Sequence, residues 1–191
     1  MAVGEGSLPY IHPVAGFRLG TACAGIKRPD HKDLVVMEIH PQASVAAVFT
    51  RNQFCAAPVQ LAKKHLTEKQ PRYLVTNTGN ANAGTGQKGL ADALAVCQAA
   101  ADLQSVTAME VLPFSTGVIG EPLPHEKIIA ALPDAFENYC ETGWDDAACG
   151  ILNTDTRPKA ASVQIELSGR PVTVSGIAKG SGMIKPNMAT M

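Results

Sequence analysis

The segment 89–103 carries the clearest helical pattern in this sequence. It is rich in alanine, and its larger apolar side chains recur with the spacing i, i+4, i+7 and i+11, at Leu90, Leu94, Cys97 and Ala101. Residues at this spacing lie along one side of an α-helix, so we predict a helix over Gly89–Leu103 that buries this side. Such a helix has to cover its apolar side with a sheet or with further helices.

Candidate strands are short, rich in β-branched residues and bounded by glycine or proline. They are Phe17–Ala22, Leu34–Ile39, Val45–Thr50, Tyr73–Asn77, Ser162–Leu167 and Pro171–Ile177. The last two flank Ser168-Gly169-Arg170, which predicts a hairpin with Gly169 in its turn.

Further helices are predicted on both sides of the alanine-rich segment. They cover Pro58–His65, Pro124–Ala131 with an extension over Asp134–Asn138, and Trp144–Leu152. Because strands and helices mix without a regular βαβ rhythm, we predict a layered α+β fold rather than a doubly wound sheet. The sequence has no internal repeat and no low-complexity linker, so we expect residues 1–191 to form a single domain.

Composition limits the partners of this domain. Of its 191 residues, 46% are hydrophobic and only 17% are charged, which suggests that another chain covers part of the surface. With a net charge of −1 and no cluster of Lys and Arg, a general nucleic-acid or anionic-membrane surface is not expected. No apolar run approaches the length of about eighteen residues that a transmembrane helix needs.

The five cysteines lie far apart, without a CxxC pair or a His cluster. This pattern is typical of reduced thiols rather than of a disulfide framework or a zinc site, and we predict no metal site. The first residues lack the basic and apolar regions of a signal peptide. Together these features predict a soluble cytoplasmic protein.

The stretch NTGNANAGTGQKG, Asn77–Gly89, leads from a predicted strand into a predicted helix. Its glycines allow a close approach of the backbone, so it could hold an anion at the helix N-terminus. Gly84, Gly86 and Gly89 match G-x-G-x-x-G, and Glu110 lies where an acid that binds ribose could fall. The dinucleotide fingerprint, however, begins directly after its strand, whereas several residues intervene here. The alternative is a turn whose Asn side chains bond the local backbone.

Two further stretches combine turn residues with polar groups. In LPFSTGVIGEPLP, Leu112–Pro124, the pair Thr116-Gly117 could aim N–H groups at one point, as an oxyanion requires, or could be a loop without chemistry. In GILNTDTRPK, Gly150–Lys159, the Thr and Asp side chains could bind an amino-acid substrate or could only cap and turn the chain.

The chain closes with KGSGMIKPNMATM. A threonine hydroxyl is a weak nucleophile, but an N-terminal Thr has its own α-amino group, with a pKa of about 8, as a base. Breaking the bond between Ala189 and Thr190 would create such a residue, and the small flexible residues around it suit an N-to-O acyl shift. Lys179 could return to the same pocket and hold a carboxylate or polarise an amide. The alternative is a flexible end without chemistry.

Several stretches together resemble the ornithine acetyltransferase family, the bifunctional glutamate N-acetyltransferases of arginine biosynthesis. They occur in the family's order and, from Gly16 to Met191, span nearly the whole chain: AVFTRNQFCAAPV, LVTNTGNANAGTG, FSTGVIGEPLP, NTDTRPK and AKGSGMIKPNMATM. The resemblance implies an α/β sandwich of the type shared with self-processing aminopeptidases, completed by a second chain.

The resemblance also implies a precursor that cuts itself between Ala189 and Thr190. The products would be an α chain, to which this sequence corresponds, and a β chain that begins at Thr190, assembled as an α2β2 heterotetramer. An α chain of this kind should end at Ala189, whereas this sequence retains Thr190 and Met191.

Site residues carry over by the same resemblance. Thr190 would be the nucleophile, Thr116 and Gly117 the oxyanion hole, and Thr154, Lys179 and Thr190 the contacts to the substrate. Many relatives have Thr where this chain has Asn153, which leaves Thr156 as an alternative to Thr154.

The reaction implied is transfer of an acetyl group from N2-acetylornithine to glutamate through an acetyl-threonine ester. No metal or prosthetic group is expected, and acetyl-CoA is an alternative acetyl donor. A self-processing aminopeptidase would share the fold and the type of nucleophile. Outside catalysis, the chain could be an anion-binding module that uses Asn77–Gly89, or a structural subunit.

Overall fold

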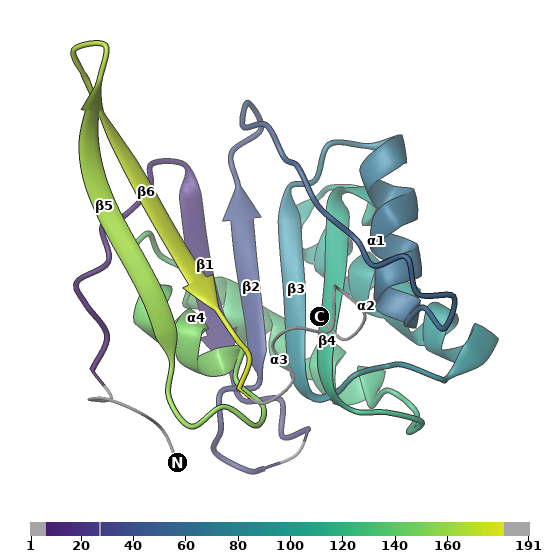
Figure 1. Ribbon diagram of the computed structural model, residues 1–191. Coiled ribbons are helices and arrows are strands. Elements are labelled where there is room, and N and C mark those ends of the chain that lie inside the picture. Colours follow the sequence, from purple (N-terminus) through teal and green to yellow (C-terminus); the bar gives the residue numbers. More distant parts are fainter. Residues whose placement is uncertain (1–6, 27, 182–191) are drawn as a thin grey trace.

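The computed structural model describes residues 7–26 and 28–181 and is built around a four-stranded sheet (Figure 1). The order in the sheet is β1-β2-β3-β4, where the strands are Phe17–Ala22, Leu34–Ile39, Tyr73–Asn80 and Val111–Val118. β2 runs antiparallel to both β1 and β3, and β3 runs parallel to β4. A separate hairpin follows, formed by β5 (Lys159–Leu167) and β6 (Arg170–Ala178).

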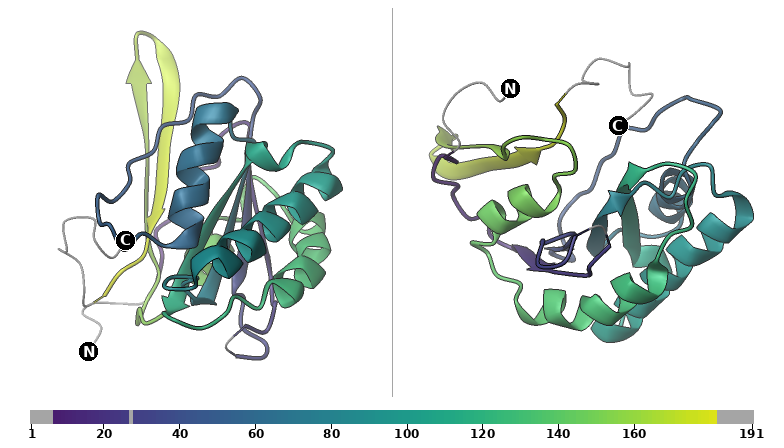
Figure 2. Two further views of the ribbon diagram at one scale, coloured as in Figure 1. Left: turned by 90° about the vertical axis from the view of Figure 1, so that its right-hand side faces the viewer. Right: turned by 90° about the horizontal axis from the view of Figure 1, so that it is seen from below.

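Helices cover the two faces of the sheet unequally. They are α1 (Ala57–Glu68), α2 (Gly86–Gln104), the 3₁₀ turn η1 (Ala108–Glu110), α3 (His125–Glu137) and α4 (Trp144–Gly150). α2 is the crossover that parallel neighbours such as β3 and β4 require. It lies with α3 on one face of the sheet, whereas α4 lies on the other face, against β1 and β2 (Figure 2).

Alternation along the strands produces a core on each face. In β2, Leu34 and Val36 join the larger cluster with α2 and α3, while Val35 between them joins Trp144 of α4 on the opposite face. Successive side chains of a strand point to opposite faces, so fully buried neighbours require cover on both sides. The predicted layered α+β fold is confirmed.

The buried side of α2 differs from the predicted one. Cys97 and Ala101 are fully buried as expected, but Leu94 is 43% exposed, and the core side is completed by Ala93 and Val96. Small side chains let a helix approach its neighbours closely, so the alanines rather than the leucines face the core. Hydrophobicity alone could not indicate this rotation.

The other predicted elements hold with one exception, but β4 (Val111–Val118) is a strand in a stretch where no strand was predicted. The predicted helices and the hairpin are confirmed, and the turn has two residues with positive φ, Ser168 at 53° and Gly169 at 73°. α3 continues through Pro133 because Leu132 and Phe136 are held in the core. The strand predicted at Val45–Thr50 is wrong: this segment has no regular structure and passes α1, where Lys63 Nζ donates to the Thr50 carbonyl.

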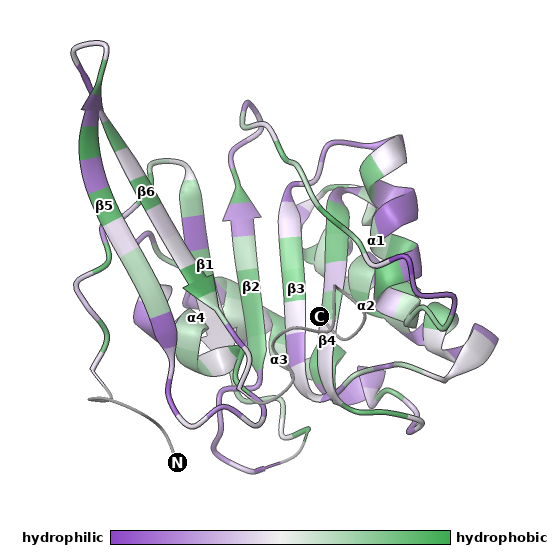
Figure 3. Ribbon diagram, in the orientation of Figure 1, coloured by the Kyte–Doolittle hydropathy of each residue, from purple (hydrophilic) through white to green (hydrophobic). Residues whose placement is uncertain are grey.

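Apolar side chains remain exposed along the hairpin and at the edge strand β4. Val163 pairs with Val174 on one side of the hairpin, and Figure 3 shows apolar stretches along both strands. The exposed apolar residues of these regions are Val163, Ile165, Leu167 and Val174 on the hairpin and Phe114, Val118 and Ile119 at β4. Contiguous exposed apolar residues mark surfaces that another element or chain covers.

Candidate active site

The described parts of the predicted site lie toward one end of the molecule. β3 and β4 end at the lower side of Figure 1. The hairpin begins at Lys159 and ends at Ala178 on the same side. Thr116-Gly117 therefore lies at the same end as the loop before β5 and the segment after β6. Polar side chains, such as Asn77 of β3 and Ser115 of β4, lie toward these strand ends.

Asn77 and Ser115 connect β3 to β4 beside the predicted oxyanion hole. The Ser115 hydroxyl donates to Asn77 Oδ1 over 2.6 Å, and Asn77 Nδ2 donates to the carbonyl of Asn80 over 2.9 Å. Asn77 and Asn80 are each only 4% exposed, so these bonds satisfy polar groups that water does not reach. They fix the residue directly before Thr116.

Gly117 touches the backbone of β3. An added Cβ would lie 2.2 Å from the Gly79 carbonyl carbon and 2.5 Å from the Asn80 nitrogen, and φ of Gly117 is 142°. The pairing of the two strands shifts register here, between Gly79 and Asn80. Only glycine fits this approach. Strand alternation puts Thr116 on the same sheet face as Phe114, away from α2 and α3.

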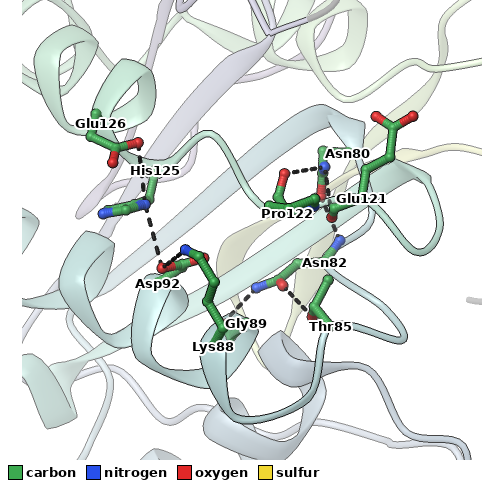
Figure 4. A network of polar contacts seen from close by, with 10 residues as sticks. All are labelled: Asn80, Asn82, Thr85, Lys88, Gly89, Asp92, Glu121, Pro122, His125 and Glu126. Atoms are coloured by element: carbon green, nitrogen blue, oxygen red, sulfur yellow. Dashed lines mark hydrogen bonds and ion pairs between the residues drawn. The ribbon is translucent and has the colours of Figure 1, made fainter.

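The polar side chains of the glycine-rich loop form hydrogen bonds within the loop itself. Asn82 Nδ2 donates to the Gly89 carbonyl, and Asn82 Oδ1 accepts from the Thr85 hydroxyl (Figure 4). Glu110 caps η1: it accepts from the Thr107 N–H, which lowers the pKa of the Glu110 carboxyl. The acid proposed for ribose is therefore occupied, and the turn stabilised by its own Asn side chains is the arrangement observed.

A buried carboxylate that the sequence analysis missed lies beside this loop. Asp92 accepts both of its bonds from Lys88 Nζ, at 2.7 and 2.9 Å, and its Oδ1 lies 3.5 Å from His125 Nδ1 (Figure 4). A shallow hollow of about 230 Å³ borders Lys88 and Asp92. No signal in the sequence indicated it, because Asp92 lies off the apolar stripe predicted for this helix.

Asp155 joins the loop that carries Thr154 to the segment that carries Lys179. Its side chain is 1% exposed, and Oδ1 accepts from Lys159 Nζ and from the Gly180 N–H, both at 2.6 Å. Thr154 and Thr156 are exposed and Lys179 is half-buried. Two stretches that are distant in sequence are thereby brought to one place.

Burial is the largest single influence on Asp155 and raises its pKa, but the bonds from Lys159 and Gly180, with the charge of Lys159, outweigh it and lower the pKa overall. A carboxyl with a lowered pKa in the folded state stabilises the protein above its ordinary pKa, near 3.8, and loses that contribution as pH falls through the lowered value. We expect Asp155→Asn in the full-length protein to reduce the free energy of unfolding at pH 7 by roughly 1–3 kcal/mol. The difference from the parent should shrink below pH 4.

Asp146→Asn is the matched control for this measurement by urea unfolding. Asp146 also pairs with a lysine, Lys32, at 2.6 Å, but both side chains are largely exposed, so little change is expected. An equal loss in the two variants, or a pH-independent loss in Asp155→Asn, would contradict the role assigned to Asp155.

Ala189 and Thr190 lie outside the described residues. Among residues 7–26 and 28–181, no group of three or more His, Cys, Asp or Glu side chains is arranged to hold a metal ion. In the same part of the chain, no helix has the length and apolar character that crossing a bilayer requires. All five cysteines are free thiols.

Comparison with known proteins identifies the family. The model of the ArgJ family matches residues 18–191. The chain belongs to the ArgJ family. The arginine biosynthesis bifunctional protein ArgJ of Pseudomonas fluorescens is 59% identical over the whole chain, and that of Methylococcus capsulatus is 60% identical over 94% of it. The chain spans about half the length of these curated relatives, 47% and 44%.

Two solved structures share the fold of this chain. The ornithine acetyltransferase of Mycobacterium tuberculosis, solved with ornithine, is 38% identical with a TM-score of 0.84, over 91% of this chain and 92% of that one. ArgJ of Bacillus halodurans is 36% identical with a TM-score of 0.80, over 92% of each chain.

Proposed function

We propose that this chain is the α chain of an enzyme that transfers the acetyl group of N2-acetylornithine to glutamate in arginine biosynthesis. The observation that carries the proposal is the match to the ArgJ family over residues 18–191, joined to the fold shared with an ornithine acetyltransferase. Acetyl-CoA would be a second donor if the enzyme is also bifunctional, as the names of its relatives state.

In the proposed mechanism the nucleophile is Thr190, whose α-amino group becomes free when the peptide bond to Ala189 is cut. Its α-amino group accepts the hydroxyl proton while Oγ attacks the acetyl carbonyl, and the Gly117 N–H with Thr116 stabilises the oxyanion. The C–N bond then breaks, ornithine leaves with the proton, and an acetyl ester remains on Thr190. The amine of glutamate attacks this ester, which releases N-acetylglutamate and restores the hydroxyl. The sequence of steps calls for no metal or prosthetic group.

Thr154 and Lys179 are proposed to hold the amino-acid part of the substrate. Support comes from the contact of Asp155 with Gly180, which keeps the two stretches together, and from the exposure of Thr154. Thr156 is exposed on the same loop and is the alternative contact. A cationic Lys179 suits the carboxylate that both ornithine and glutamate carry.

The partner is proposed to be a β chain from the same precursor, in an α2β2 assembly. Curated relatives are about twice as long as this chain, whereas the chain of the M. tuberculosis enzyme is matched over 92% of its length, which supports division of a longer precursor. The exposed apolar residues of the hairpin and β4 are surfaces that a second chain would cover. Free thiols suit a cytoplasmic enzyme.

The test is to express the full-length precursor and to measure acetyl transfer from N2-acetylornithine to glutamate. We expect a second chain that begins at Thr190, parallel double-reciprocal lines typical of a ping-pong reaction, and a β-chain peptide that is heavier by one acetyl group after mixing with N2-acetylornithine alone. Hydrolysis without transfer would instead indicate an aminopeptidase-like activity. The absence of both reactions would refute the proposal.

A further inference from the structure

Asn80 connects two parts of the chain that flank the proposed oxyanion hole. Its Nδ2 donates to the carbonyls of Glu121 and Pro122, at 3.3 and 3.0 Å, and its Oδ1 accepts from the Asn82 N–H at 2.8 Å (Figure 4). Asn80 is 4% exposed. Both the nitrogen and the oxygen of its side-chain amide are therefore bonded inside the protein. Asn80 does not bind a substrate with this amide but acts through the segments that the amide connects.

Those segments enclose Thr116-Gly117. Before the pair, Ser115 is bonded to Asn77, which in turn donates to the carbonyl of Asn80. After it, the Val118 carbonyl accepts from the Ala81 N–H, and the Gly120 N–H donates to the carbonyl of Ala83, both at 2.8 Å. The side chain of Asn80 then bonds the next two residues after Gly120, at their carbonyls. The backbone of the pair is thus anchored on both sides to the exit of β3.

We propose that Asn80 is a positioning residue, which sets the direction of the Thr116-Gly117 backbone toward the reacting carbonyl. This inference rests on the proposed function. Oxyanion donors act only within a narrow range of distance, about 2.7–3.1 Å from the developing charge. Without the Asn80 amide, the Glu121–Pro122 segment loses its two side-chain bonds to β3, and the chain after the pair is left to the backbone bonds of Val118 and Gly120.

The experiment measures steady-state acetyl transfer in the full-length, self-processed enzyme, with rates divided by the amount of β chain that accepts an acetyl group. For Asn80→Ala we expect kcat and kcat/KM to fall together, about tenfold, with KM for N2-acetylornithine within about twofold, because the bonds lost act on the transition state. Asn80→Asp keeps the acceptor for Asn82 but loses both donors. It should show the same loss of kcat, and it tests the proposal if the alanine variant does not fold.

Asn82→Ala is the matched control. Asn82 is fully buried in the same loop and also makes side-chain bonds, to Gly89 and Thr85, but these face α2. We expect a lowered unfolding midpoint but kcat within about twofold. Equal losses of kcat at both positions, or parental kcat in Asn80→Ala and Asn80→Asp, would overturn the inference. A parental enzyme that transfers no acetyl group would instead refute the proposed function.

Discussion

Replacing Thr190 with alanine should leave the precursor as one uncut chain and abolish acetyl transfer. The substitution removes the hydroxyl that is proposed both to attack the preceding carbonyl during maturation and to carry the acetyl group afterwards. Loss of a nucleophile lowers kcat by at least roughly 10⁴-fold in enzymes of comparable design. A denaturing gel checks the first effect, and the acetyl-transfer assay with purified protein checks the second.

Thr190→Ser is the control, because it keeps an oxygen nucleophile and, after cleavage, an α-amino group beside it. We expect two chains on the gel and a reduced but measurable rate. Two chains from Thr190→Ala would show that another group performs the cleavage. A Thr190→Ser variant as inactive as Thr190→Ala would show that the hydroxyl alone does not account for the activity.

The fold could be predicted where the local residue pattern and the tertiary packing favour the same element. Short β-branched segments such as Leu34–Ile39 became strands because they are buried from both sides. Val45–Thr50 also contains β-branched residues, but it pairs with no strand among the described residues, and its Val48 is 81% exposed. In α2, periodicity predicted the helix but not its rotation, since the packing of alanines against neighbouring elements depends on tertiary distances.

The site was predicted less completely, because part of it depends on backbone groups. Thr154 and Lys179 stood out as parts of motifs, and the contact from Asp155 to Gly180 connects their segments. The role proposed for Asn80 could not be predicted from the sequence in the same way. Its partners are carbonyls 41 and 42 residues away, and any residue type supplies a carbonyl. Side-chain identity therefore carries no signal for such a bond.

Gly117→Ala should be the most damaging substitution within the described part of the site. The added methyl group would lie 2.2 Å from the Gly79 carbonyl carbon and 2.5 Å from its oxygen, and these are backbone atoms that no rotamer change can move. The φ of 142° is itself unfavourable for alanine. Overpacking and strain together should lower the free energy of unfolding by about 3 kcal/mol or more. Displacement of the N–H should lower kcat by roughly 10²–10³-fold, as for other oxyanion donors.

Gly120→Ala separates the close contact from the unusual backbone angle. Gly120 also has a positive φ, 83°, and lies three residues further along, but an added Cβ there would meet nothing within 4 Å. Strain alone should cost about 1–2 kcal/mol, with most of the acetyl-transfer rate retained. Urea unfolding and kcat of both full-length variants check the comparison. If Gly117→Ala turned over substrate as fast as Gly120→Ala, the approach of β4 to Gly79 would have no part in catalysis, and the oxyanion would have to be stabilised by groups elsewhere.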